Sequence, residues 1–177
     1  MAFHVAPLGS VAFEGLMAAH QRQVFRTALR LLGHREDAKD ASQEVFLRLF
    51  THLARIDARR PLAPWLYRVT INVCRTMNKK RRRRDTLPHE DALVHAQPRG
   101  PRPDVAAELA EERDVAERGL DTLPDKERAA VVLRDIEGLS TREVAAILGS
   151  AEVTVRSQIS RARVKLKRFR DRALKGG

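Results

Sequence analysis

Apolar residues recur every three or four positions along most of this chain, which is the spacing of amphipathic helices. The series runs over residues 11–32, where Gly33 ends it, then over residues 35–54, and again from Pro64 into a run of lysines and arginines that closes at Arg84. No stretch alternates with the period of two that a strand needs. The pattern therefore predicts an all-α protein.

Prolines and a glycine interrupt the helical spacing between residues 85 and 104. This composition predicts a flexible linker of about 20 residues, which reaches roughly 60 Å when it is extended. Helical spacing resumes over residues 105–123 and 125–136. We therefore expect two small helical domains, residues 1–84 and 105–177, joined by the linker at 85–104.

The segment from Ser140 to Arg168 predicts a helix, a tight turn and a second, strongly basic helix. Ser140 and Glu143 have the spacing of a capping box, in which each side chain bonds the backbone amide of the other residue. Gly149 can adopt the left-handed conformation that ends a helix. Two helices joined by so short a turn are typical of a helix-turn-helix, whose second helix lies in the major groove of DNA.

The outer face of that second helix carries candidate DNA contacts. Arginine can bond guanine edges and serine can bond either base type, while cations further along the helix contact phosphates. The alternative is a solvated basic face on an ordinary helical hairpin. The candidates are Thr154, Arg156, Ser157, Ser160, Arg161, Arg163 and Lys167.

The helix predicted from Pro64 has a polar face of a different kind. An aromatic ring, an amide and three cations follow one another at steps of three or four, at Trp65, Arg68, Asn72, Arg75 and Lys79. Stacking on a base, reading a base edge and following the phosphates are what binding of a single-stranded nucleic acid requires. The alternative is a tryptophan in the core beside a solvated basic face.

Charge and residue usage narrow the function classes. The formal net charge of +11 over 177 residues favours a polyanionic partner, and nucleic acid is the first expectation. No apolar run approaches the roughly 18 residues of a membrane span and no secretory signal is found, so we expect a cytoplasmic protein without membrane insertion. With one cysteine, scattered histidines and no phosphate loop or nucleophile–base pair, we expect no metal, no cofactor and no enzymatic activity.

Four segments together resemble one known family. They are DAKDASQEVFLRLF from Asp37, PWLYRVTIN from Pro64, LPDKERAAVVLRDIEGLSTREVAAILG from Leu123 and EVTVRSQISRAR from Glu152. Their order and spacing resemble those of bacterial RNA polymerase sigma factors of the extracytoplasmic-function (ECF) class, which are relatives of sigma-70. The resemblance implies a sigma region 2-like domain followed by a region 4-like helix-turn-helix domain.

The resemblance also implies a role and its site residues. A sigma factor directs core RNA polymerase to promoters and helps open the minus-ten element. Asn72 matches the family's base-contacting asparagine, and Ile56 lies where the family commonly has a pocket-forming phenylalanine. The helix at 35–54 resembles the one that docks on the beta-prime clamp helices, which implies polymerase contacts at Asp40, Gln43, Glu44, Phe46 and Leu47.

Further partners that the resemblance implies are promoter DNA, the beta flap of the polymerase and an anti-sigma factor. The main alternative is a stand-alone helix-turn-helix regulator that binds duplex DNA as a dimer. Such a regulator would have no use for the face from Trp65 to Lys79.

Overall fold

The structure is a computed structural model that describes residues 8–57, 59–85, 106–173 and 175. Helices joined by short turns make up nearly all of these residues, and no strand occurs among them. The all-α prediction is therefore confirmed for the described part of the chain.

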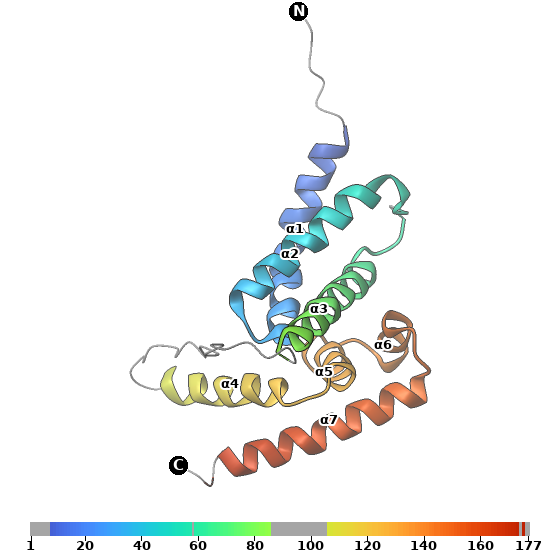
Figure 1. Cartoon of the computed structure of the whole chain (residues 1–177). Coiled ribbons are helices and arrows are strands. Elements are labelled where there is room, and N and C mark those ends of the chain that lie inside the picture. Colours follow the sequence, from blue (N-terminus) through green and yellow to red (C-terminus); the bar gives the residue numbers. More distant parts are fainter. Residues whose placement is uncertain (1–7, 58, 86–105, 174, 176–177) are drawn as a thin grey trace, which may run out of the picture.

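Three long helices form the first group (Figure 1). They are α1 (Leu8–Leu32), α2 (Arg35–His52) and α3 (Ala63–Asp85), with the short 3-10 helix η1 (Leu53–Arg55) after α2. The turn between α1 and α2 depends on Gly33, whose φ of 76° favours glycine and whose amide donates to the Leu29 carbonyl at 2.8 Å. This closes α1 at the residue that the sequence predicted.

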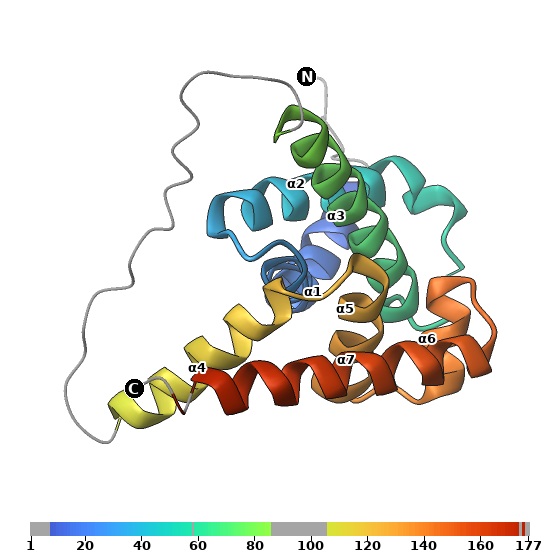
Figure 2. The same cartoon turned by 60° about the horizontal axis from the view of Figure 1, so that its bottom comes forward.

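The second group contains the predicted helix-turn-helix. It comprises α4 (Ala106–Asp121), α5 (Asp125–Val131), the π-helix η2 (Val132–Ile136), α6 (Thr141–Leu148) and α7 (Glu152–Ala173). Figure 2 shows α7 as a long helix along which α4, α5 and α6 lie. The helix predicted over 125–136 is thus α-helical only in its first half.

The π-helix changes the direction of the chain before the helix-turn-helix. The Glu137 amide donates to the carbonyl of Val132, five residues earlier, at 2.9 Å. A π turn inserts an extra residue into the helix and is often found at functional positions. Here it rotates the end of the helix so that the Glu137 side chain reaches α1 and α3.

Both groups share one hydrophobic core. Fully buried residues of the first group, such as Val45 and Leu66, belong to the same contiguous cluster as Leu133, Val144 and Val155 of the second group. α1 packs on α4, α5 and η2, and α3 packs on α6. The two predicted domains therefore lie in direct contact. The predicted linker at 85–104 lies outside the described residues, apart from Asp85, which ends α3.

Candidate nucleic-acid interface

The outer face of α3 is held in place by a buried stripe along the same helix. Leu66, Tyr67, Thr70, Ile71 and Cys74 are buried, and the Thr70 hydroxyl donates to the Leu66 carbonyl at 2.7 Å. With this stripe turned inward, the predicted contacts lie on the opposite side of the helix. Arg68, Asn72, Arg75 and Lys79 are all exposed there.

The aromatic end of this face is only partly open. Trp65 is half-buried against the core, and its ring centroid lies 6.2 Å from that of His52. Ile56, which follows η1, is also partly buried. Part of each side chain is therefore accessible to a base, and the rest packs against the core.

Arg68 contacts the other group of helices. Its guanidinium donates to the Ala146 carbonyl of α6 at 2.6 Å. One of the cations predicted to follow a single strand is therefore engaged by the first helix of the helix-turn-helix.

The helix-turn-helix begins as the sequence predicts. The Ser140 amide donates to the Glu143 carboxylate at 2.7 Å, and the Glu143 amide donates to the Ser140 hydroxyl at 3.2 Å. These bonds from Ser140 lower the pKa of the Glu143 carboxyl. Gly149 has a φ of 62° and ends α6 in the left-handed conformation. The capping box and the glycine end of α6 are therefore both confirmed.

The second helix of the helix-turn-helix, α7, buries one stripe and exposes the predicted residues. Val155, Gln158, Ile159 and Ala162 are buried against the preceding helices. The exposed set includes every predicted contact: Thr154, Arg156, Ser157, Ser160, Arg161, Arg163 and Lys167.

Three of these cations pair with carboxylates within the fold, and Arg156 does so with Glu152 of α7 itself at 3.1 Å. Arg163 makes a two-pronged ion pair with Asp135 of η2, at 2.9 and 2.6 Å, which raises the pKa of the arginine. Arg161 lies 3.5 Å from Glu127, a carboxylate that also accepts from Lys165 at 2.8 Å. The ion pairs of Arg161 and Arg163 join α7 to α5 and η2, so these arginines also help to hold α7 in its orientation.

The outer face of α7 also includes exposed residues that the sequence did not predict as DNA contacts. Val153, in the first turn of α7, is 68% exposed, and Val164 is 48% exposed. Arg168 lies on the same side and is also exposed. The sequence predicted DNA contacts from polar and charged side chains, and the valines have neither. An apolar residue at the start of a recognition helix can nevertheless contact a thymine methyl group.

An apolar groove lies between α1 and α2, away from both polar faces. Its volume is about 750 Å³, and its lining includes Gln43, Phe46 and Leu47 of the predicted polymerase contacts. Leu47 and Phe50 are 58% and 54% exposed, and the Phe50 ring packs edge-on against Phe13 at 5.3 Å between centroids. Asp40 is exposed on α2 outside this lining, and Glu44 pairs with Arg48 at 2.7 Å. Three of the five predicted polymerase contacts therefore line the groove, whereas Asp40 and Glu44 lie outside its lining.

The described residues contain no group of three or more histidine, cysteine or acidic side chains that could hold a metal ion. Among the same residues, no helix combines the length and the apolar character needed to cross a membrane.

Comparisons with known proteins match both helical groups. Sigma-70 region 2 matches residues 16–84, and sigma-70 region 4 matches residues 113–166. The ECF RNA polymerase sigma factor SigE of Mycolicibacterium smegmatis is 36% identical over 160 residues, which are 89% of this chain and 61% of that relative. SigM of Mycobacterium tuberculosis, another ECF sigma factor, is 34% identical over 169 residues, which are 96% of this chain and 82% of that protein.

Solved structures show the same fold. CnrH, in complex with the cytosolic domain of CnrY, has a TM-score of 0.65 and 27% identity over 92% of this chain and 89% of that chain. The sigma factor RpoE of Bartonella quintana, in complex with the anti-sigma factor NepR, has a TM-score of 0.69 at 22% identity over 90% of this chain and 97% of that chain.

The chain thus has the two-domain helical architecture of sigma-70 relatives, with a region 2 domain before a region 4 domain. It belongs to the ECF RNA polymerase sigma factors.

Proposed function

We propose that this sigma factor binds core RNA polymerase, directs it to promoters by reading their minus-thirty-five element with α7, and opens the minus-ten element with α3. The observation that carries this proposal is the presence of two unlike polar faces on one chain, one on α3 and one on α7. The α3 face combines an aromatic ring, an amide and cations, which suits an unpaired strand. The α7 face belongs to a helix-turn-helix, which suits the duplex.

Promoter opening on this account needs no covalent chemistry. A base that is extruded from the duplex and held on α3 by Asn72 and Trp65 shifts the equilibrium toward the open state by the free energy of that binding. The duplex contacts of α7 raise the local concentration of the strand at α3, because both surfaces belong to one chain. Each surface can therefore be weak when it acts alone.

The groove between α1 and α2 supports a role in polymerase binding. Its exposed Leu47 and Phe50, next to the buried Phe46, form an apolar surface that an amphipathic helix of a partner can cover. We assign this surface to the beta-prime clamp helices, and we assign the beta flap to the region 4 domain. Because CnrH and the Bartonella RpoE are complexes with CnrY and the anti-sigma factor NepR, we also propose an anti-sigma partner for this chain.

Transcription in vitro tests the proposal. Core polymerase and this protein are incubated with a pool of genomic fragments, and the start sites are sequenced. We expect initiation that depends on the protein, with two shared sequence motifs upstream of the starts. If the core enzyme neither binds the protein nor initiates with it, the proposal is wrong and a stand-alone DNA-binding regulator takes its place.

A further inference from the structure

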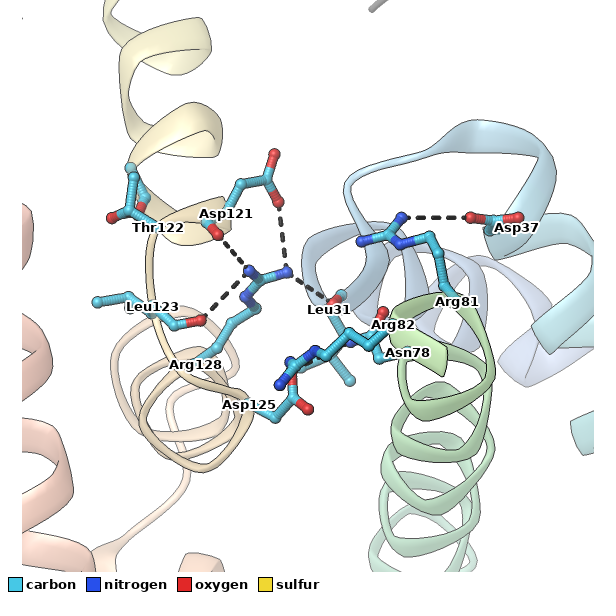
Figure 3. Close-up of polar contacts among 11 residues, drawn as sticks. Leu31, Asp37, Asn78, Arg81, Arg82, Asp121, Thr122, Leu123, Asp125 and Arg128 are labelled. Carbon is cyan, nitrogen blue, oxygen red and sulfur yellow. Dashed lines mark hydrogen bonds and ion pairs between the residues drawn. The ribbon is translucent and has the colours of Figure 1, made fainter. Parts of the chain in front are cut away.

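The two ends of α3 have different neighbours. At the C-terminal end, Arg82 donates to Asp125 of α5 at 2.7 Å, and Arg81 lies 3.7 Å from a carboxylate oxygen of α2 (Figure 3). Carboxylates of neighbouring helices therefore pair with both of these cations. At the N-terminal end, α2 instead places the imidazole ring of His52 beside Trp65. This end of α3 is thus the one at which two aromatic rings can meet a base.

His52 and Trp65 form an aromatic pair between α2 and α3. Their ring centroids lie 6.2 Å apart with 49° between the ring planes, a separation that is typical of interacting aromatic rings. His52 is exposed and Trp65 is half-buried. Because the planes are tilted, the rings do not cover each other flat, and part of each ring stays accessible. The aromatic end of the α3 face therefore consists of two rings.

His52 lies away from the apolar groove between α1 and α2. The lining of that groove includes Phe50 but neither His52 nor Arg48, which is one turn earlier on the same side of α2. On α3, Asn72 follows Trp65 by about two turns and therefore lies on the same side of that helix. The imidazole thus extends the surface formed by Trp65 and Asn72.

Hydrogen bonds determine which nitrogen of His52 carries the proton. Nδ1 lies 2.9 Å from the Arg48 carbonyl oxygen and 3.1 Å from the Thr51 hydroxyl oxygen. A carbonyl oxygen can only accept, so Nδ1 carries the hydrogen. The Thr51 hydroxyl donates its own proton to the Arg48 carbonyl at 3.0 Å, so its oxygen is able to accept from Nδ1. Nε2 of the neutral ring is then an acceptor, and none of the described residues bonds to it.

An acceptor beside a stacking ring suits one class of base. At their major-groove edges, adenine and cytosine carry an amine that donates, whereas guanine and thymine carry a carbonyl oxygen that accepts. A base that stacks beside Trp65 and directs its amine at Nε2 of His52 makes both contacts, whereas a carbonyl oxygen in that place would meet a second acceptor. The Asn72 amide can donate and accept, so it accommodates either class.

We infer that His52 is a specificity-determining residue of the single-strand face, because its Nε2 accepts a hydrogen bond from the exocyclic amine of an unpaired adenine or cytosine that stacks beside Trp65. The inference rests on the proposed binding of the unpaired strand by α3. The alternative is that His52 only caps the C-terminal end of α2, where its Nδ1 bonds a backbone carbonyl. Such a cap contributes to stability and has no influence on which base is bound.

Two substitutions separate the ring of His52 from its acceptor nitrogen. His52→Phe keeps an aromatic ring and removes the acceptor, whereas His52→Ala removes both. Because His52 is exposed at the end of α2, neither change disturbs the core. His34→Ala is the matched control, since His34 is an exposed histidine before the start of the same helix and its side chain makes no capping bond. Thermal melting followed by circular dichroism reports the stability of each full-length variant.

Binding is measured with single strands of deoxyadenosine or deoxycytidine, each about 12 nucleotides long. The matched strands contain purine or 2-pyrimidinone, which are the same bases without the exocyclic amine. Trp65 is the only tryptophan in the sequence, so its fluorescence in the full-length protein reports stacking at this position. The anisotropy of labelled strands on the complex with core polymerase gives a second measurement, and core polymerase alone is its control.

Removal of the amines should weaken binding to the wild type and to His34→Ala about fivefold, through the loss of one hydrogen bond. His52→Phe should bind both kinds of strand equally, with the affinity that the wild type has for the strands without amines. His52→Ala should bind both kinds roughly tenfold more weakly than the wild type binds the strands with amines, because it also loses a stacking surface.

A wild type that binds strands with and without amines equally would overturn the inference, and so would a His52→Phe variant that keeps the wild-type preference. A lower melting temperature of His52→Ala with an unchanged preference would show that His52 is only a cap. All three of these outcomes leave α3 as a single-strand surface. Strands that neither change the Trp65 fluorescence nor bind the polymerase complex better than core polymerase alone would instead contradict the proposed function of α3, and the inference with it.

Discussion

The two candidate DNA faces, on α7 and on α3, differ in their contacts with the rest of the chain. The α7 face points outward, and carboxylates of α5 and η2 pair with cations along its sides, including Arg161 and Arg163. The α3 face is contacted by the other domain through Arg68, and its tryptophan is half-buried. The α7 face is thus exposed along its length, whereas one cation of the α3 face is engaged by α6.

This difference matches the order of events in promoter opening. A duplex is present before any strand is unpaired, so an exposed duplex-reading helix is useful at once. A single-strand face that is exposed in the free protein would bind any unpaired nucleic acid, because stacking and phosphate contacts have little sequence preference. Engagement of Arg68 by α6 reduces the positive charge available on that face.

The largest effect that separates the two faces is expected from Asn72→Ala. Loss of one good base contact costs about 1–3 kcal/mol, so open-complex formation should fall roughly 5- to 150-fold. Binding to core polymerase should be unchanged, because Asn72 is exposed on α3 and lies outside the α1–α2 groove. Permanganate footprinting measures the opening and a gel shift with core enzyme measures the binding. An equal loss of both would contradict the role of Asn72.

On α7, Arg156→Ala should weaken binding to a minus-thirty-five duplex about tenfold and reduce discrimination among base variants. Arg156 is exposed in the first two turns, where its acidic neighbour is Glu152 on the same helix. Arg163→Ala is the comparison, because its guanidinium is held by Asp135, and it should mainly lower the melting temperature. Equal discrimination by wild type and Arg156→Ala would remove this residue from the reading face.

Val153→Ala should have a smaller and more specific effect. If the exposed valine packs on a thymine methyl group, replacing that thymine with deoxyuridine costs the wild type about 0.8 kcal/mol, or roughly fourfold in affinity. The variant should be insensitive to that replacement while it still binds the duplex. A wild type that binds but responds to no thymine replacement would show that Val153 reads no base.

The stability of the fold at high pH should depend on two buried groups of α3, Tyr67 and Cys74. Burial and the hydrogen bond to Glu137 raise the pKa of Tyr67 to about 12, and burial raises the pKa of Cys74 to about 12. Both groups are therefore neutral in the folded protein where they would ionise in the unfolded chain. Their contribution to the free energy of unfolding is complete below about pH 9 and is lost as pH rises toward 12.

Denaturant titrations between pH 8 and 12 measure this loss. Tyr67→Phe should flatten the decrease above pH 10, and Cys74→Ala should flatten the part that begins near pH 9. A slope that neither substitution changes would mean that other groups control stability in this range.

Local signals predicted much of the fold. The capping box of Ser140 and Glu143 and the helix ends at Gly33 and Gly149 depend on neighbours in sequence, and the structure confirms them. Apolar spacing also predicted that Val155, Ile159 and Ala162 of α7 are buried, whereas on α3 it indicated Leu66 and Val73 but missed Tyr67, Thr70, Ile71 and Cys74. On α2, where the family resemblance implied polymerase contacts, Leu47 and Phe50 are exposed.

Contacts between residues far apart in the sequence could not be predicted from such local signals. Glu137 meets Thr27 over a separation of 110 residues, and Arg163 meets Asp135 over 28. The spacing of residues along a helix does not predict which carboxylate a given arginine will pair with, because that depends on how whole helices pack. The π turn that aims Glu137 at α1 and α3 is another product of packing, because its sequence has the spacing of an ordinary helix.

The central claim is that α3 binds the unpaired strand and α7 binds the duplex. Photocrosslinking tests this claim most directly. A photoreactive amino acid is placed at Arg75 on α3 or at Thr154 on α7, and each variant is assembled with core polymerase on a promoter found by the transcription experiment. We predict crosslinks from position 75 to the unpaired strand of the minus-ten element and from position 154 to the minus-thirty-five duplex. Crosslinks from both positions to the same duplex segment would contradict the account.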